Sequence, residues 1–269
     1  VPEGGLAVLC GEDPRLRRLA ERVGCRAVTY GFSGDCRYKA SHLALGAGGS
    51  TFRCWRDGQE LARVSLRVPG RHNILNALAA LAVAVELGVP AQPVVEALAR
   101  FRGAGRRFEV IGEPGGVLIV DDYAHHPTEI RATLAAARLL GRPVTAVFQP
   151  HRYTRTQSLY ASFLDCFQDA DHLVVTEIYP AGEKPIPGVT AARLAADIQR
   201  ASGRPVHLVT ERERVARELL PRLRPGDVVV TLGAGDIRKT ALELRDLLSG
   251  SEEAWLSPRQ PVAMVEAEG

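Results

Sequence analysis

The second half of this 269-residue chain repeats one pattern: a short apolar run, a polar loop, then a segment with helical periodicity. Short continuous apolar runs alternating with helices predict a parallel sheet that is covered on both faces. The expected strands are Val117–Val120, Val144–Phe148, Leu173–Thr176, Val206–Val209 and Val228–Leu232. The expected helices span about Pro127–Leu140, Leu159–Phe167, Ala191–Ala201, Arg212–Leu223 and Ile237–Leu248. We therefore predict an α/β, doubly wound domain over residues 104–249, with a mostly parallel sheet.

The first part of the chain, residues 1–103, has a mixed pattern. Leu6–Cys10 reads as a short buried strand and Pro14–Val23 as a helix. Polar and apolar residues alternate over residues 50–68 on either side of Asp57-Gly58, a dipeptide that favours a tight hairpin turn. This pattern predicts two antiparallel strands.

A longer helix is expected after Gly70, where apolar residues fall at helical spacing. Asn73 is a suitable cap for its start, and Gly88 marks its end. A second short helix, about Pro93–Phe101, leads into Arg102-Gly103-Ala104-Gly105. Small residues accommodate large dihedral changes, so we expect a hinge at this stretch.

Composition excludes several classes of function. Lys and Arg number 34 against 31 Asp and Glu, a net charge of +3 without any dense basic block, which argues against nucleic-acid binding. No apolar run approaches the roughly 18 residues of a membrane span. Five cysteines without CxxC spacing fit reduced thiols, and hence a cytoplasmic protein. The aperiodic residues 250–269 predict a disordered tail.

Ionisable residues gather where the predicted strands end. Asp121, Asp122, His125 and His126 follow the first strand of the second half, and a group around His151 follows the next. The carboxyl ends of parallel strands meet at one edge of a sheet, which is where open α/β sheets place their sites. We therefore expect a functional site at this edge.

The chemistry of that edge favours an anionic ligand. Arg152 and Arg155 each offer a bidentate fork for a carboxylate or phosphate, although two solvated surface arginines are the alternative. A two-metal site is disfavoured, because Glu177 and Asp236 are the only further carboxylates at the strand ends. A nicotinamide site is disfavoured too, because the glycine loop at residues 233–235 does not complete GxGxxG.

Five segments, taken in order, resemble the Mur ligases, and within them the branch that joins L-alanine to UDP-N-acetylmuramate. The segments are Gly70-Arg71-His72-Asn73 with Asn76-Ala77; Arg106-Arg107-Phe108; Asp121 to Glu129, reading DDYAHHPTE; Phe148 to Thr156, reading FQPHRYTRT; and Thr231 to Ile237, reading TLGAGDI. The resemblance extends from about Leu6 to Leu248. One departure is Ala124, where the family pattern has glycine, so the backbone there must accommodate a Cβ atom.

The resemblance implies a domain organisation. Residues 1–103 would be the C-terminal part of the family's central ATP-binding domain, and residues 104–249 its Rossmann-like C-terminal domain. None of the three lysines lies in GxxxxGK[ST] spacing, and the chain begins at Val1. We therefore expect the UDP-binding domain, the P-loop and most Mg²⁺ ligands to lie in a preceding portion, and the 269 residues to be inactive alone.

The resemblance also implies an activity and residue roles. ATP would phosphorylate the lactyl carboxylate of UDP-N-acetylmuramate, and the amine of L-alanine would attack the acyl phosphate, a step of peptidoglycan precursor synthesis and thus of cell-wall growth. Expected ATP-binding residues are His72, Asn73 and Asn76 (adenine), Arg107 (phosphates) and Asp122 (ribose). Expected L-alanine-binding residues are Tyr123, His125, Arg152 and Arg155. No nucleophile and no metal ligand is assigned. One nucleotide would then touch both domains and close them about the hinge.

Two other functions remain as alternatives to the L-alanine ligase. One is a ligase of the same family that recycles murein tripeptide, and the other is a non-catalytic nucleotide- or amino-acid-binding module.

Overall fold

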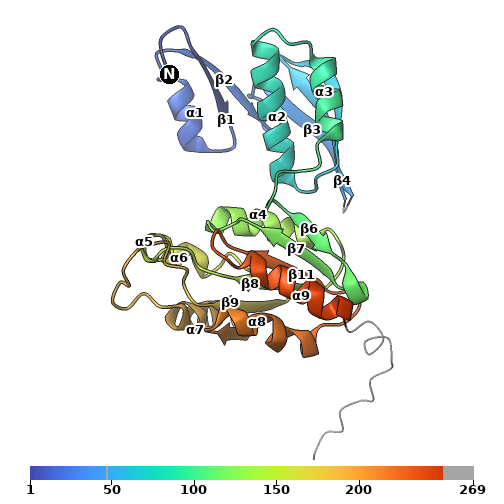
Figure 1. Ribbon diagram of the computed structural model, residues 1–269. Helices are drawn as coiled ribbons and strands as arrows, with labels where there is room; N and C mark the ends of the chain where they lie inside the picture. The colour runs from blue at the N-terminus through green and yellow to red at the C-terminus, as the bar shows by residue number, and fades with distance from the viewer. Residues whose placement is uncertain (47, 251–269) are drawn as a thin grey trace, which may run out of the picture. The chain divides into compact units, whose positions relative to one another are not determined.

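The computed structural model describes residues 1–46 and 48–250, and the chain divides into two compact units (Figure 1). Unit 1 comprises Val1–Arg107 with Thr128–Gly141, and unit 2 comprises Phe108–Pro127 with the chain from Arg142 onward. Within the described ranges, no helix has both the length and the apolar character needed to cross a lipid bilayer. The tail predicted over residues 250–269 lies, apart from Gly250, outside the described residues.

Unit 1 contains a five-stranded sheet in the order β1-β2-β3-β4-β5. β1, β2 and β3 run parallel, whereas β3, β4 and β5 are antiparallel. Apolar residues of α2, among them Ile74, Leu78 and Leu81, pack with sheet residues into one core. The elements are β1 (Leu6–Cys10), α1 (Pro14–Ala20), β2 (Arg26–Gly31), β3 (Tyr38–Gly46), β4 (Gly49–Arg56), β5 (Gln59–Leu66), α2 (Arg71–Glu86) and α3 (Ala91–Arg100).

The predicted hairpin is confirmed. β4 and β5 pair antiparallel, and the turn residues Asp57 and Gly58 have φ of 50° and 81°. Positive φ at both central positions is the geometry in which Asp-Gly is favoured, because it matches the twist of the two strands. In unit 1 the sequence analysis missed two strands, β2 and β3, and α1 ends at Ala20 rather than Val23.

The start of α2 corrects the capping role expected for Asn73. The helix begins at Arg71 with Gly70 as N-cap, at φ 100°. No side chain caps it. Asn73 is the third residue of the helix, within its first turn, and its Nδ2 donates to the carbonyl of Pro69 at 2.7 Å. The prediction failed because Gly70 accommodates the positive φ of the entry turn, so the helix starts before the first good capping residue.

The C-terminal turn of α2 is held by Glu86, whose side chain is fully buried. Its carboxylate accepts from the Tyr38 hydroxyl at 2.7 Å and from Arg56 at 3.1 Å, and it pairs with Arg26 and Arg37. Burial acts to raise the pKa of Glu86, but the Tyr38 hydroxyl and the three arginines outweigh it and the pKa lies below its usual range. The ionised carboxylate therefore ties α2 to β2, β3 and β4.

From Leu118 to Gly250 the chain alternates strands and helices as predicted, and the strand at Glu109–Gly112 that precedes them was not predicted. The strands are β6 (Glu109–Gly112), β7 (Leu118–Asp122), β8 (Val144–Phe148), β9 (His172–Thr176), β10 (Val206–Val209) and β11 (Val228–Leu232). The helices are α4 (Pro127–Arg138), α5 (Tyr153–Ser158), α6 (Tyr160–Phe163), α7 (Ala191–Ser202), α8 (Arg212–Leu219) and α9 (Arg238–Gly250), with 3-10 turns at Pro114–Gly116 and Leu220–Arg222.

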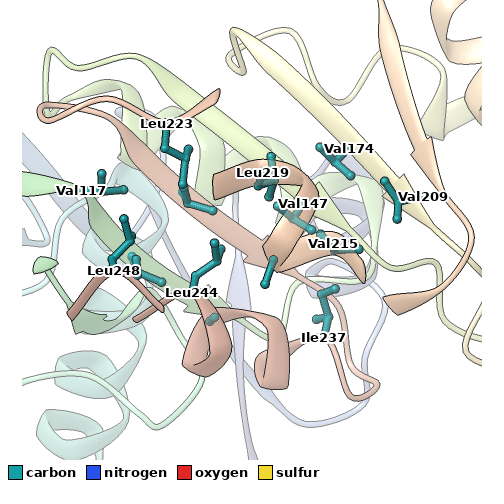
Figure 2. Packing of buried hydrophobic residues seen from close by; sticks show 14 residues of the cluster. Val117, Val147, Val174, Val209, Val215, Leu219, Leu223, Ile237, Leu244 and Leu248 are labelled. Carbon is teal, nitrogen blue, oxygen red and sulfur yellow. The ribbon is translucent and has the colours of Figure 1, made fainter. Parts of the chain in front are cut away.

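The sheet of unit 2 has the order β10-β9-β8-β11-β7-β6, and β6 alone of these strands runs antiparallel. This confirms the mostly parallel, doubly wound sheet. On one face, valines of the strands pack with Val215 and Leu219 of α8 and Leu244 of α9 (Figure 2). Phe148 of β8 packs instead against Phe163 and Phe167, so the other face is covered as well.

The start of the helix after β8 differs from the prediction, and this affects the candidate site. The first helix after β8 begins at Tyr153, not near Leu159 as expected, and a second short helix follows it. Arg155 therefore lies on α5 rather than in a loop, and Arg152 is the N-cap residue of that helix. Residues 153–158 carry little apolar periodicity, which is why the pattern placed the helix later.

Candidate functional site

Four of the residues expected to bind ATP lie in unit 1. His72, Asn73 and Asn76 occupy the first two turns of α2, and the Asn76 amide donates to Asn73 Oδ1 at 3.3 Å. Burial lowers the pKa of His72, and the positive charge of Arg107 lowers it further, so the neutral imidazole is favoured. A Cβ at Gly70 would lie 2.7 Å from the His72 ring, so this glycine permits the ring its position. Their assignment to adenine and phosphate stays a prediction.

In unit 2, the adjacent strands β7, β11 and β8 bring three loops to one edge of the sheet. Asp122, the last residue of β7, has its carboxylate fixed by two backbone N–H groups, those of Phe108 at 2.7 Å and Ala124 at 2.8 Å. Ala124 is buried and is not among the residues with positive φ in the described chain. Alanine therefore fits where the family pattern has glycine.

Asp121 has a different environment, because successive residues of a strand point to opposite faces. Its side chain is fully buried and accepts from the Thr231 hydroxyl at 2.7 Å and from Arg238 at 3.1 Å. Arg238 also donates to both carboxylate oxygens of Glu109, at 2.7 and 2.8 Å. Hydrogen bonds and charges of Glu109 and Asp121 raise the pKa of Arg238. This network joins β6, β7, β11 and α9, which is a structural role.

The glycines after β11 permit close packing. A Cβ at Gly235 would lie 2.5 Å from Gln149 Oε1 and 2.6 Å from Cγ of Tyr179. Buried Gln149 uses its amide to hold this loop, since its Nε2 donates to Asp236 at 2.8 Å and its Oε1 accepts from the Ile237 N–H at 3.2 Å. The Gly-Ala-Gly sequence thus lets the loops after β8, β9 and β11 meet.

Four aromatic rings connect the strand-end loops of β7, β8 and β9. Tyr123 and His125 meet edge to face with centroids 5.3 Å apart, and His125 lies 5.9 Å from His151. His151 in turn stacks on Tyr179, at 5.6 Å and an interplanar angle of 10°. The expected alanine-binding residues Tyr123 and His125 are therefore linked through His151 to the segment that carries the arginines.

His151 also fixes one of those arginines. Arg155 lies one helical turn away, and its NH1 approaches His151 Nδ1 at 2.9 Å. Because a guanidinium only donates, Nδ1 accepts and the proton of the neutral ring is on Nε2. The pKa of His151 is lowered to about 4, mainly by burial and also by the charges of Arg155, His125 and Arg152, while Glu183 acts in the opposite direction. At pH 7 this edge carries cationic arginines around a neutral imidazole.

This arrangement predicts the titration of His151. Its ring should titrate near pH 4, and Arg155→Ala should move the midpoint upward, because a nearby positive charge is removed. Since the folded pKa lies below the unfolded value of about 6.5, the contribution to stability is full above pH 6.5 and is lost as pH falls toward 4. Side-chain NMR of the 269-residue chain measures the midpoint. Arg193→Ala, at an exposed arginine on α7, serves as control, and an unchanged midpoint in Arg155→Ala would contradict the assignment.

Arg152 has an unusual backbone conformation for a residue with a side chain, φ 70° and ψ 137°. Such conformations cost about 1–3 kcal/mol and persist only where neighbouring contacts hold them. Here the Arg152 N–H donates to the Tyr179 carbonyl at 2.8 Å, and the Tyr179 N–H donates to the Pro150 carbonyl at 2.8 Å. The Arg152 carbonyl accepts from the backbone N–H and hydroxyl of Thr156. These hydrogen bonds hold the strained conformation of Arg152 at the start of α5.

Sequence reasoning assigned no role to three residues of this edge, His151, Tyr179 and Glu183. His151 was noticed as part of the polar group after β8 but received no ligand. Tyr179 and Glu183 follow β9 in the segment Tyr179-Pro180-Ala181-Gly182-Glu183, which reads as a turn. Open α/β sheets place their sites at the carboxyl ends of the strands, and this rule, which identified the other loops, applies to the loop after β9 as well. Among the described residues, no group of three His, Cys, Asp or Glu side chains is arranged to hold a metal ion.

Two models of known protein families match the chain, one in its first part and one in its second. Residues 1–84 match the Mur ligase middle domain, and residues 106–235 match the Mur ligase glutamate ligase domain. The chain therefore belongs to the Mur ligase family.

Curated relatives identify the branch of that family to which the chain is similar. The UDP-N-acetylmuramate–L-alanine ligase of Geobacter sulfurreducens is 50% identical over 239 residues, which is 88% of this chain and 52% of the relative. The ligase of the same name from Symbiobacterium thermophilum is 48% identical over 255 residues, 92% of this chain and 53% of the relative. The chain thus spans about half the length of the curated relatives it matches.

Solved structures agree on the fold. A UDP-N-acetylmuramate–alanine ligase from Thermotoga maritima superposes with a TM-score of 0.74 at 28% identity, covering 91% of this chain and 52% of that one. A murein peptide ligase from Psychrobacter arcticus has a TM-score of 0.66 at 24% identity, covering 93% and 52%. The latter similarity shows the fold alone.

Proposed function

We propose that this chain supplies part of the ATP-binding region and the amino-acid-binding domain of an ATP-dependent ligase that joins L-alanine to UDP-N-acetylmuramate in the cytoplasm. The observation that carries the proposal is the pair Arg152 and Arg155, set around the neutral His151 at the carboxyl edge of the sheet. The names of the relatives at 46–50% identity support the choice of substrates.

The two arginines suit the carboxylate of an amino acid. A guanidinium donates two parallel hydrogen bonds to a carboxylate, and Arg155 is already oriented by His151. Tyr123 and His125 would close the other side of the alanine, whose methyl group needs little room. This arrangement leaves the amine directed away from the arginines, toward the acyl phosphate that it attacks.

On the nucleotide side, His72, Asn73 and Asn76 would contact adenine, Arg107 the phosphates and Asp122 the ribose. The neutral state favoured for His72 suits contact with an uncharged base. Phosphoryl transfer depends on positioning and on stabilising negative charge, usually with Mg²⁺. We assign no Mg²⁺ ligand among the residues of this chain.

The test replaces the matching half of the Geobacter sulfurreducens ligase with residues 1–249 of this chain. We expect phosphate release that depends on ATP, UDP-N-acetylmuramate and L-alanine together. The 269-residue chain alone should release none, since it has no GxxxxGK[ST] sequence.

Two other outcomes distinguish the alternatives. Turnover with the murein tripeptide but not with L-alanine would identify a recycling ligase. A folded chimera that binds ATP and L-alanine but turns over neither substrate, beside an active parent enzyme, would favour a non-catalytic binding module.

A further inference from the structure

Glu183 lies in the segment after β9 and contacts α5, 29 residues earlier in the chain. Its carboxylate accepts from the Thr154 N–H at 3.0 Å and from the Thr154 hydroxyl at 2.6 Å. These hydrogen bonds hold the pKa of Glu183 below its usual range, and the charge of Arg152 acts in the same direction. The carboxylate is therefore ionised at neutral pH and bound to the first turn of α5.

This contact replaces a cap that α5 lacks. A helix start leaves backbone N–H groups without partners inside the helix, and a side chain at the N-cap normally satisfies one of them. The N-cap residue here is Arg152, which makes no side-chain cap hydrogen bond. An arginine has no acceptor with which to do so. Glu183 supplies the acceptor from a distant segment, and its negative charge suits a helix start.

The segment that carries Glu183 is itself firmly placed. The Glu183 N–H donates to the Pro180 carbonyl at 3.0 Å across a turn in which Ala181 and Gly182 have φ of 49° and 85°. Tyr179, at the start of this turn, forms backbone hydrogen bonds with Pro150 and Arg152, the residues on either side of His151. One turn therefore contacts both the His151 ring and the first residues of α5.

We propose that Glu183 is a positioning residue for the amino-acid site, which sets Arg152 and Arg155 by anchoring the start of α5. The proposal rests on the function proposed above, because it assumes that these arginines hold the carboxylate of L-alanine. Glu183 itself touches neither substrate. Its effect passes through Thr154 to the two flanking arginines of the same short helix.

The experiment compares Glu183→Ala and Glu183→Gln with Glu211→Gln, a control at an exposed glutamate of unit 2. In the chimeric ligase, Glu183→Ala should raise the KM for L-alanine about fivefold, the factor that corresponds to the roughly 1 kcal/mol a helix cap contributes to stability, with little change in the KM for ATP. Glu183→Gln should have a smaller effect, because its amide oxygen still accepts from Thr154. The control should change neither constant.

A second measurement does not depend on the proposed function. In the 269-residue chain, Glu183→Ala should shift the NMR resonances of the Arg152 and Arg155 side chains, and Glu211→Gln should not. Unmoved arginine resonances would overturn the positioning role whatever the substrate is. If they move but both KM values rise together, Glu183 acts on general stability and its link to the amino acid is wrong. If they move and the chimera does not use L-alanine, the positioning role stands and the proposed function fails.

Discussion

Replacing Arg155 by alanine in the chimeric ligase is expected to raise the KM for L-alanine by roughly 30-fold or more, with the KM for ATP nearly unchanged. Losing one partner of a buried, hydrogen-bonded charge pair costs about 2–5 kcal/mol, and 1.4 kcal/mol corresponds to a factor of ten. Arg152→Ala should act in the same direction, with a smaller effect because Arg152 is more exposed. Steady-state kinetics with each substrate varied in turn measures both constants.

Two further variants sharpen this prediction. Arg155→Lys keeps the positive charge but loses the planar fork, so it should recover only part of the affinity. Arg193→Ala removes an exposed arginine of the same unit and should leave both constants unchanged. Equal increases in the KM for alanine and for ATP would show that these arginines do not serve the amino acid specifically.

The second large effect concerns stability. Arg238→Met is expected to destabilise unit 2 by about 3 kcal/mol, because it leaves the fully buried Asp121 without its arginine partner. Hydrogen exchange of the backbone amides of β7 and β11 measures the free energy of opening in this unit. Protection at these strands should fall while unit 1 is unaffected.

A double variant tests whether the unpaired carboxylate of Asp121 causes the predicted loss of stability. Asp121→Asn combined with Arg238→Met removes the buried charge along with its partner, so part of the lost stability should return. Lys239→Met, at the neighbouring and mostly exposed lysine, should have little effect. If the double variant is as unstable as the sum of the single ones, loss of packing rather than an unpaired carboxylate explains the effect.

The sequence predicted the fold of unit 2 well because its central strands β7, β8 and β11 are buried on both faces and read as continuous apolar runs. β8, β10 and β11 begin and end where the apolar runs do. β2 and β3 escaped detection because one face of each is less buried and β3 is irregular, with His42 at φ 52° between two stretches of regular pairing. Mixed polarity and a bulge remove the periodicity on which strand prediction depends.

The candidate site was only partly accessible to sequence reasoning. The strand-end rule selected Asp122, His125, Arg152 and Arg155 because each lies near the end of a predicted strand. It did not separate Asp121, which has a structural role, from Asp122, because the partners of Asp121 lie 110 and 117 residues away. The cap of α5 comes likewise from a distant segment. Such long-range contacts leave no local signature in one sequence.

The position of β11 has a consequence for how the protein emerges from the ribosome. β11 pairs with β7 on one side and β8 on the other, although it is the last strand in sequence order among the described residues. Until residues 228–232 leave the exit tunnel, the facing edges of β7 and β8 have no strand between them, and exposed edges favour wrong pairing. Assembly of the arginine-bearing edge is therefore a late event of biosynthesis, completed by five residues near the end of the domain.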